Sequence, residues 1–213
     1  MNGANPWEKV NEFCIWILKV AYLNLLWIGF SILGGVVFGL FPSTGAMYSI
    51  TKKWINKEHV GRMHKEFWKV YKNEFFKLNQ FGLIFILVGY VLVYDFLFLQ
   101  MNAGKLVFLN PILGFLSICY LVTLFYFFPV YTQFDLKFFQ YIKQSFLIAA
   151  SCVIETMAMV TSFFLLGIIV WFVPGIIPLF TGSVLALCFT WCSLRAIEKI
   201  KIRKKILEDR KAL

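Results

Sequence analysis

The sequence predicts an all-α membrane protein with about five transmembrane helices and additional amphipathic cytoplasmic helices. Of its 213 residues, 60% are hydrophobic and only 15% are charged, and the mean hydropathy is +0.75. Because about a quarter of the residues of a soluble domain are charged, this composition indicates that lipid surrounds most of the surface. A membrane helix needs about 20 apolar residues, so the chain has room for about five spans. We therefore interpret residues 1–213 as a single membrane domain.

Five long apolar runs are the predicted spans. Each is too uniformly apolar to be a strand of a β-barrel, whose two faces alternate. The runs cover residues 18–40, 81–99, 106–131, 146–172 and 176–194. We expect the first run to be retained, because it is longer than a signal-peptide core and no basic stretch precedes it. Residues 132–172 allow two interpretations, namely one long tilted span or an interfacial helix followed by a span.

The positions of the basic residues predict the orientation of the chain. Of the 21 Lys and Arg residues, 18 lie in the loop at residues 41–80, in the connection after the third span, or in the tail at residues 195–213. The remaining three are Lys9, Lys19 and Lys105. The positive-inside rule then places the C-terminus in the cytoplasm and the N-terminus outside, which requires an odd number of spans.

Small residues dominate the end of the first predicted span. Gly35 and Gly39 are four residues apart, which is the spacing that lets a second helix approach closely. Pro42 lacks a backbone N–H and is expected to bend the chain and start a new helix over residues 43–54. We interpret this stretch as a packing seam followed by a helix break. The seam could serve self-association or be satisfied within one chain.

Residues 62–78 are predicted to form an amphipathic helix in the cytoplasmic loop. An aromatic face and a basic face alternate with helical periodicity. The residues that define the two faces are Phe67, Trp68, Tyr71 and Phe75, and Lys65, Lys69 and Lys72. Such a helix can lie on anionic lipid at the cytoplasmic surface, pack within the chain, or dock on a partner protein. We do not expect nucleic acid as a partner, because no nucleic-acid-binding motif accompanies the basic residues.

Ionisable residues inside the spans are the next candidates for a functional role, since charges are costly in hydrocarbon. Asp95 lies in the outer part of the second span, and Glu155 lies about a third to halfway into the fourth. Lys19, at the outer end of the first span, is predicted at a depth similar to that of Asp95 and could pair with it. Both acids also have purely structural interpretations, such as pairing or protonation.

The sequence contains no motif that indicates an enzyme. His59 and His64 are the only histidines, and no HExxH, GxSxG or P-loop motif is present. Cys188 and Cys192 share a helix face, but no His or further Cys lies nearby in sequence to complete a zinc site. We therefore predict no catalytic residue, no cofactor and no metal.

Two stretches of the first half resemble the YesL-like family, a group of small bacterial multi-pass membrane proteins of unassigned molecular function. They are GLFPSTGA, followed by a basic KKW, and FWKVYKNEF. The resemblance rests on Gly39, Phe41, Pro42, Gly45 and Ala46 and on residues 67–75. It implies location in a bacterial plasma membrane. Because members commonly accompany carbohydrate-uptake systems, it also implies an accessory role in sugar import, with the permease of a sugar ABC transporter as a candidate partner.

Three functional hypotheses follow. The first is a non-enzymatic accessory protein of a carbohydrate-uptake system. The second is a small proton-coupled or solute-coupled carrier or channel that uses Asp95 and Glu155, although the internal repeats common in carriers are not evident. The third is a lipid-interacting scaffold that works through the helix at residues 62–78.

Overall fold

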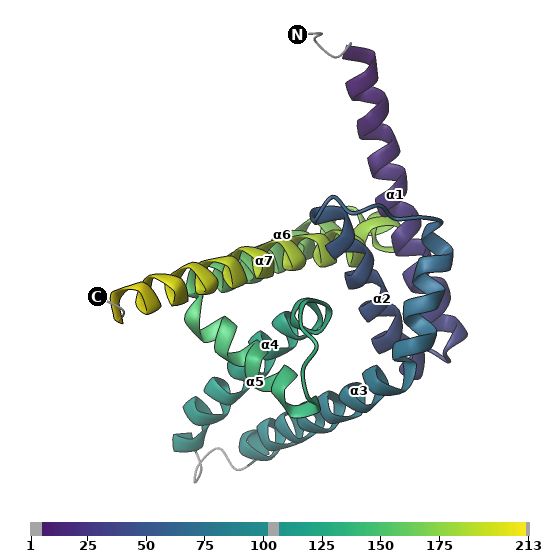
Figure 1. Cartoon of the computed structure of the whole chain (residues 1–213). Helices are drawn as coiled ribbons and strands as arrows, with labels where there is room; N and C mark the ends of the chain where they lie inside the picture. Colours follow the sequence, from purple (N-terminus) through teal and green to yellow (C-terminus); the bar gives the residue numbers. More distant parts are fainter. Residues whose placement is uncertain (1–5, 102–106, 212–213) are drawn as a thin grey trace.

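The computed structural model describes residues 6–101 and 107–211, and this part of the chain folds into α-helices without any strand (Figure 1). The α-helices are α1 (Pro6–Leu33), α2 (Val37–Ile55), α3 (Met63–Met101), α4 (Asn110–Gln133), α5 (Phe138–Ser151), α6 (Val153–Phe172) and α7 (Ile177–Lys211). Short 3₁₀ turns, η1 (Val107–Leu109) and η2 (Pro174–Ile176), precede α4 and α7. The predicted all-α class is confirmed.

In the described part of the chain, five helices have the length and apolar composition to cross a membrane, namely α1, α3, α4, α6 and α7. Large apolar side chains remain exposed along them, such as Phe96 on α3, Phe115 on α4 and Phe164 on α6. Exposed apolar surface of this extent is expected of a chain whose solvent is lipid. The expected number of spans is therefore confirmed, while their boundaries differ from prediction. The third predicted span starts at Leu106, which lies outside the described residues.

The first predicted span is wrong at its C-terminal end, because the helix stops before residue 40. Helix α1 ends at Leu33, and α2 starts at Val37. In the turn between them, Gly35 and Val36 have φ angles of +73° and +63°, in the left-handed region that a continuous helix cannot contain. Gly35 and Gly39 therefore lie on different elements and do not form one helical seam. Pro42 is inside α2 and does not start it.

Close approach at Gly39 is nevertheless observed, within the chain. A Cβ atom on Gly39 would collide with the backbone carbonyl of Ser31 on α1. Two side-chain hydrogen bonds join the same two helices, between the hydroxyls of Ser31 and Ser43 (2.6 Å) and from Trp27 Nε1 to Thr44 Oγ1 (3.0 Å). Helices α1 and α2 therefore form a tight hairpin around the turn.

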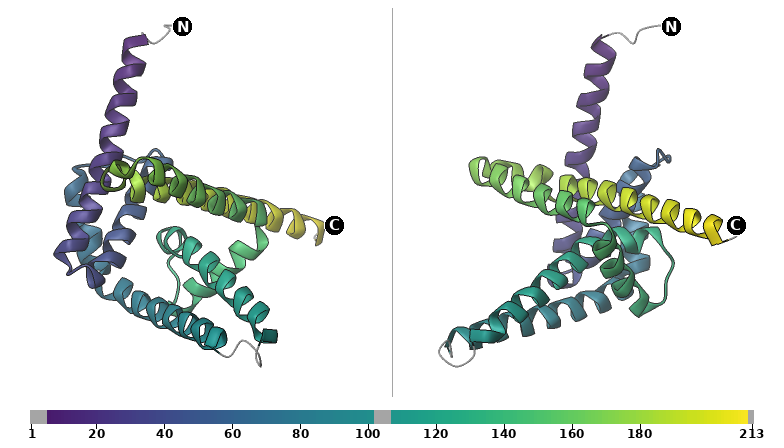
Figure 2. Two further views of the ribbon diagram at one scale, coloured as in Figure 1. Left: turned by 180° about the vertical axis from the view of Figure 1, so that it is seen from behind. Right: turned by 90° about the vertical axis from the view of Figure 1, so that its left-hand side faces the viewer.

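The predicted amphipathic helix and the second predicted span are parts of one helix, α3, which changes direction along its length (Figures 1 and 2). Phe67 and Tyr71 are buried against Phe30 of α1, with ring centroids 5.0 Å and 5.3 Å apart. Of the three interpretations of this aromatic face, packing within the chain holds for these two residues, and lipid contact is wrong for them. Trp68 remains half exposed, and the lysines of the opposite face are exposed.

Beyond the last turn of α4, residues 132–172 contain two helices, α5 and α6, and not one long span. Helix α5 ends at Ser151 and α6 begins at Val153, and the intervening Cys152 has φ −125° and ψ 66°, outside the helical region. The fourth predicted span therefore starts too early, since residues 146–151 belong to α5. The interpretation with a separate helix before a shorter span is confirmed.

The long helices do not form a bundle of parallel rods. Helices α6 and α7 lie side by side, and α1 runs across their direction in each view (Figure 2). The C-terminal half of α3 pairs with α4, where the Tyr120 hydroxyl donates to the Phe85 carbonyl (2.9 Å). The aromatic core lies where α3, α4 and α5 meet and includes Phe81, Phe127 and Tyr141.

Candidate functional site

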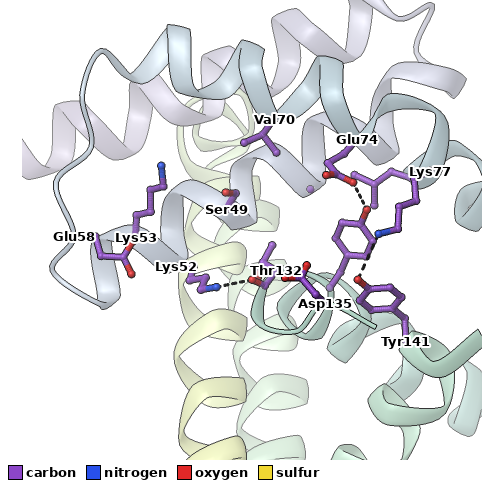
Figure 3. A pocket seen from close by; sticks show the side chains of 13 residues that line it. Ser49, Lys52, Lys53, Glu58, Val70, Glu74, Lys77, Thr132, Asp135 and Tyr141 are labelled. Carbon is purple, nitrogen blue, oxygen red and sulfur yellow. Dashed lines mark hydrogen bonds between the residues drawn. The ribbon is translucent and has the colours of Figure 1, made fainter. Parts of the chain in front are cut away.

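A polar pocket of about 260 Å³ lies where α2, α3, the end of α4 and the start of α5 meet (Figure 3). It gathers ionisable side chains from segments that are far apart in sequence. The lining residues are Gly45, Ser49, Lys52, Lys53, Glu58, Val70, Glu74, Lys77, Leu78, Tyr131, Thr132, Asp135 and Tyr141. Residues of the predicted loop at residues 41–80, here called the basic loop, and of the connection after the third span thus meet, as expected if both lie on one side of the membrane.

Lys77 of α3 contacts the two tyrosines that line one side of the pocket, Tyr131 and Tyr141. Its ammonium nitrogen lies 4.9 Å and 5.1 Å from the ring centroids of Tyr131 and Tyr141, within the range of a cation–π interaction. The same nitrogen is 3.5 Å from the Tyr141 hydroxyl, and the Tyr131 hydroxyl donates to the Glu74 carboxylate (Figure 3). Glu74 and Lys77 are three residues apart, on one face of α3, so this face anchors both the end of α4 and the start of α5.

On the opposite side of the pocket, the two lysines at the end of α2 contact neighbouring helices. Lys52 donates to the backbone carbonyl of Thr132, 2.6 Å away, in the last turn of α4. The last carbonyls of a helix lack intrahelical partners and carry partial negative charge, so an ammonium group stabilises them. Lys53 forms an ion pair of 2.5 Å with Glu66 near the start of α3. These contacts fix α2 relative to both α3 and α4.

The chemistry of the pocket suits binding through hydrogen bonds. Ammonium groups, carboxylates, hydroxyls and two tyrosine rings line a space large enough for a small polar molecule or a turn of a partner protein. Several of these charged groups already hold helices together through the contacts above. In the described part of the chain, no three His, Cys, Asp or Glu side chains gather closely enough to hold a metal ion.

The structure does not bring Lys19 and Asp95 together. Lys19 lies against the basic loop and lines a cavity with Trp54 and His59, whereas Asp95 is exposed beside an apolar groove between α3 and α4. No ion pair among the described residues joins them. The predicted pair is therefore wrong, because α1 crosses the other helices and Lys19 does not lie at the depth that a parallel bundle would give it.

Glu155 is in the first turn of α6, nearer the end of the span than predicted. Its carboxylate is buried and forms an ion pair with Lys199 on α7. The pair ties α6 to α7 where the apolar part of α7 passes into the basic tail. Glu155 and Asp95 thus belong to different sites.

Replacing Lys199 by methionine should lower the stability of the chain by about 1–2 kcal/mol. The substitution leaves the Glu155 carboxylate buried without this partner, while the half-exposed position of Lys199 limits the loss. The measurement is thermal unfolding of the purified protein in detergent. Lys204→Met is the matched control, since Lys204 lies on the same helix in an exposed, 3.8 Å pair with Glu208. Equal midpoints for the two variants would show that the buried pair contributes nothing.

Comparison with known proteins places the chain beside proteins of unknown function. The family model described as "Protein of unknown function, DUF624" matches residues 20–96, which run from α1 through α2 into α3. The uncharacterized protein YteU of Bacillus subtilis (strain 168) is 34% identical over 180 residues, which cover 84% of this chain and 81% of YteU. The uncharacterized protein YesL of the same strain is 32% identical over 197 residues, covering 92% and 93% of the two chains. The uncharacterized protein YesV is 30% identical over 187 residues, covering 87% and 90%. No solved structure matches this chain.

Proposed function

Because this chain belongs to the DUF624 family of YesL-like proteins, a family of unknown function, we propose that it is a non-enzymatic accessory protein of the bacterial plasma membrane. In this role it binds another membrane protein and converts no substrate. The proposed partner is the permease of a sugar ABC transporter. The resemblance to the YesL-like family, whose members commonly accompany carbohydrate-uptake systems, is the reason for proposing this partner.

The observation that carries the proposal is the projection of the first part of α1 from the rest of the molecule (Figures 1 and 2). The buried residues of α1 begin at Val20, while Trp7, Phe13 and Trp16 are 79%, 62% and 48% exposed. A projecting helix with large aromatic side chains can be contacted from every direction by a neighbouring membrane protein. Aromatic residues are also enriched at the centres of protein interfaces.

The polar pocket supports a role in binding. Its three lysines and Glu74 form contacts between helices, such as Lys52 with Thr132 and Glu74 with Tyr131. Such contacts fix the mutual positions of α2, α3 and α4 and so present a rigid surface. A rigid surface loses less conformational entropy when a partner binds, so the entropic cost of binding is smaller.

Affinity purification from native membranes in mild detergent tests the proposal. The bait carries a tag at its C-terminus, and bound proteins are identified by mass spectrometry. We expect a sugar-transporter permease in stoichiometric amount. Repeated recovery of the bait alone would contradict the proposal.

A pair of triple variants tests the contribution of α1. Trp7, Phe13 and Trp16 are changed to alanine together, and we expect recovery of the permease to fall at least tenfold. The control changes three exposed apolar residues of α6, Phe164, Ile168 and Phe172, to alanine. Equal loss of the partner in both variants would show that the projecting part of α1 is not the binding surface.

A further inference from the structure

A second cavity is lined by basic side chains from two distant segments, and we call it the basic cavity. Lys19 comes from α1, and Lys57 and His59 come from the connection between α2 and α3. Trp54 and Met63 supply apolar walls. The cavity has a volume of about 440 Å³, which is within the usual range for small-molecule sites.

The backbone holds Lys57 in a conformation that favours glycine. Its φ angle is +58°, at the first position after the C-terminal cap of α2. Lys57 N–H donates to the Trp54 carbonyl (3.1 Å), and Glu58 N–H donates to the Lys53 carbonyl (2.9 Å), which is the Schellman pattern of a helix end. Glycine is the usual residue there, because a Cβ atom is strained in the left-handed region. The lysine thus occupies this position at a cost to folding, and its side chain lines the basic cavity.

Positive charge exceeds negative charge in the lining. Glu58 is the carboxylate among the described lining residues, and it accepts a hydrogen bond from the Asn56 side chain (3.1 Å). In the described part of the chain, neither Lys19 nor Lys57 lies within ion-pair distance of a carboxylate. Two ammonium groups that line one cavity repel each other, and an anion between them would relieve that repulsion.

We propose that the basic cavity binds a phosphate-type anion. Lys19 and Lys57 supply the charge, the His59 imidazole supplies a further hydrogen-bond donor, and the Trp54 indole forms an apolar wall. Ammonium groups are common phosphate ligands in proteins. The phosphate can belong to a lipid headgroup, since lysine and tryptophan both favour the headgroup region of a membrane, or to a phosphate compound in solution.

Thermal unfolding of the full chain in a neutral detergent tests the site with two probes. One is inorganic phosphate, compared with sodium chloride at equal ionic strength. The other is phosphatidylglycerol in mixed micelles, compared with phosphatidylcholine. We expect a rise of the unfolding midpoint that saturates with at least one probe. Stabilisation by phosphatidylglycerol alone assigns the site to a lipid headgroup, and stabilisation by inorganic phosphate assigns it to a phosphate in solution.

Three variants locate the effect. Lys57→Gly removes the ammonium group and relieves the backbone strain, so the variant should fold at least as well as the parent without any probe. Lys19→Gln removes the second charge from an exposed position on α1. We expect both to raise the half-saturating concentration of the probe at least tenfold, whereas Lys72→Gln, an exposed lysine of α3 outside the basic cavity, should leave it unchanged. The proposal is overturned if neither probe stabilises the parent protein, or if Lys72→Gln weakens the effect as much as Lys57→Gly does.

Discussion

Replacing Asn24 by leucine should loosen α1 from the start of α7 and lower the stability of the chain by about 2–3 kcal/mol. Asn24 is fully buried, and its side-chain amide donates to the carbonyls of Pro178 (2.8 Å) and Ile177 (3.3 Å). Its side-chain oxygen accepts a hydrogen bond from the backbone N–H of Ser183 (3.0 Å). One side chain thus satisfies three backbone groups of a helix that lies more than 150 residues away in sequence.

The loss of stability depends on the backbone groups that lose their hydrogen-bond partner when leucine replaces Asn24. Leucine fills a similar volume but makes none of these bonds, so the buried Ser183 N–H loses its partner and the part-buried carbonyls of Ile177 and Pro178 lose a donor. A buried polar group that loses its partner costs about 1–3 kcal/mol. Hydrogen bonds between membrane helices are worth less, about 0.6–2 kcal/mol each, because the unfolded chain in a membrane also finds partners. Three contacts near the low end of the range for membrane helices give the expected loss of about 2–3 kcal/mol.

Thermal unfolding in detergent measures this loss directly. Asn73→Leu is the matched control, because Asn73 is an exposed asparagine on α3 and the same change there should shift the midpoint little. If Asn24→Leu and Asn73→Leu unfold at the same temperature, the contact between α1 and α7 does not hold the two helices together.

Composition and hydropathy are sufficient to predict the helical class and the number of spans, but they do not show where a helix breaks inside an apolar run. Residues 18–40 resemble one span because residues 34–36 carry no polar or charged side chain. In membrane helices glycine is common, so Gly35 resembled a packing residue and gave no sign of a left-handed turn. The break at Cys152 has no Gly or Pro to mark it, and it is evident only from the backbone angles of Cys152.

The candidate site was less predictable than the fold. The charge distribution correctly grouped the basic loop with the connection after the third span, but it could not show that Lys77 lies over Tyr131 and Tyr141. Glutamates placed among the lysines of α3, Glu66 and Glu74, were the available signal, since both become partners of residues on other helices. The error over Lys19 arose because depth was counted along parallel spans, whereas α1 crosses α7 and brings Lys19 to the basic loop.

Replacing Gly39 by alanine should open the hairpin between α1 and α2 and lower stability by about 2 kcal/mol. The added Cβ would fall inside contact distance of the Ser31 carbonyl oxygen and 2.9 Å from the Phe30 carbonyl oxygen. Both are backbone atoms, so no side-chain rotation can relieve the clash and α1 must move away. That movement stretches the 2.6 Å bond between Ser31 and Ser43, which are both buried. Overpacking of this kind typically costs about 1–3 kcal/mol.

The higher helix propensity of alanine opposes the clash, so the direction of the stability change in Gly39→Ala shows which effect is larger. Alanine has a higher helix propensity than glycine by about 1 kcal/mol, so Gly39→Ala would stabilise α2 if α1 did not lie against it. Gly29→Ala, on α1, isolates that propensity term, because nothing lies within 4 Å of a Cβ atom at Gly29. We expect the unfolding midpoint in detergent to fall for Gly39→Ala and to stay level or rise for Gly29→Ala. A rise in both would mean that the two helices of the hairpin are farther apart than the collision at Gly39 requires.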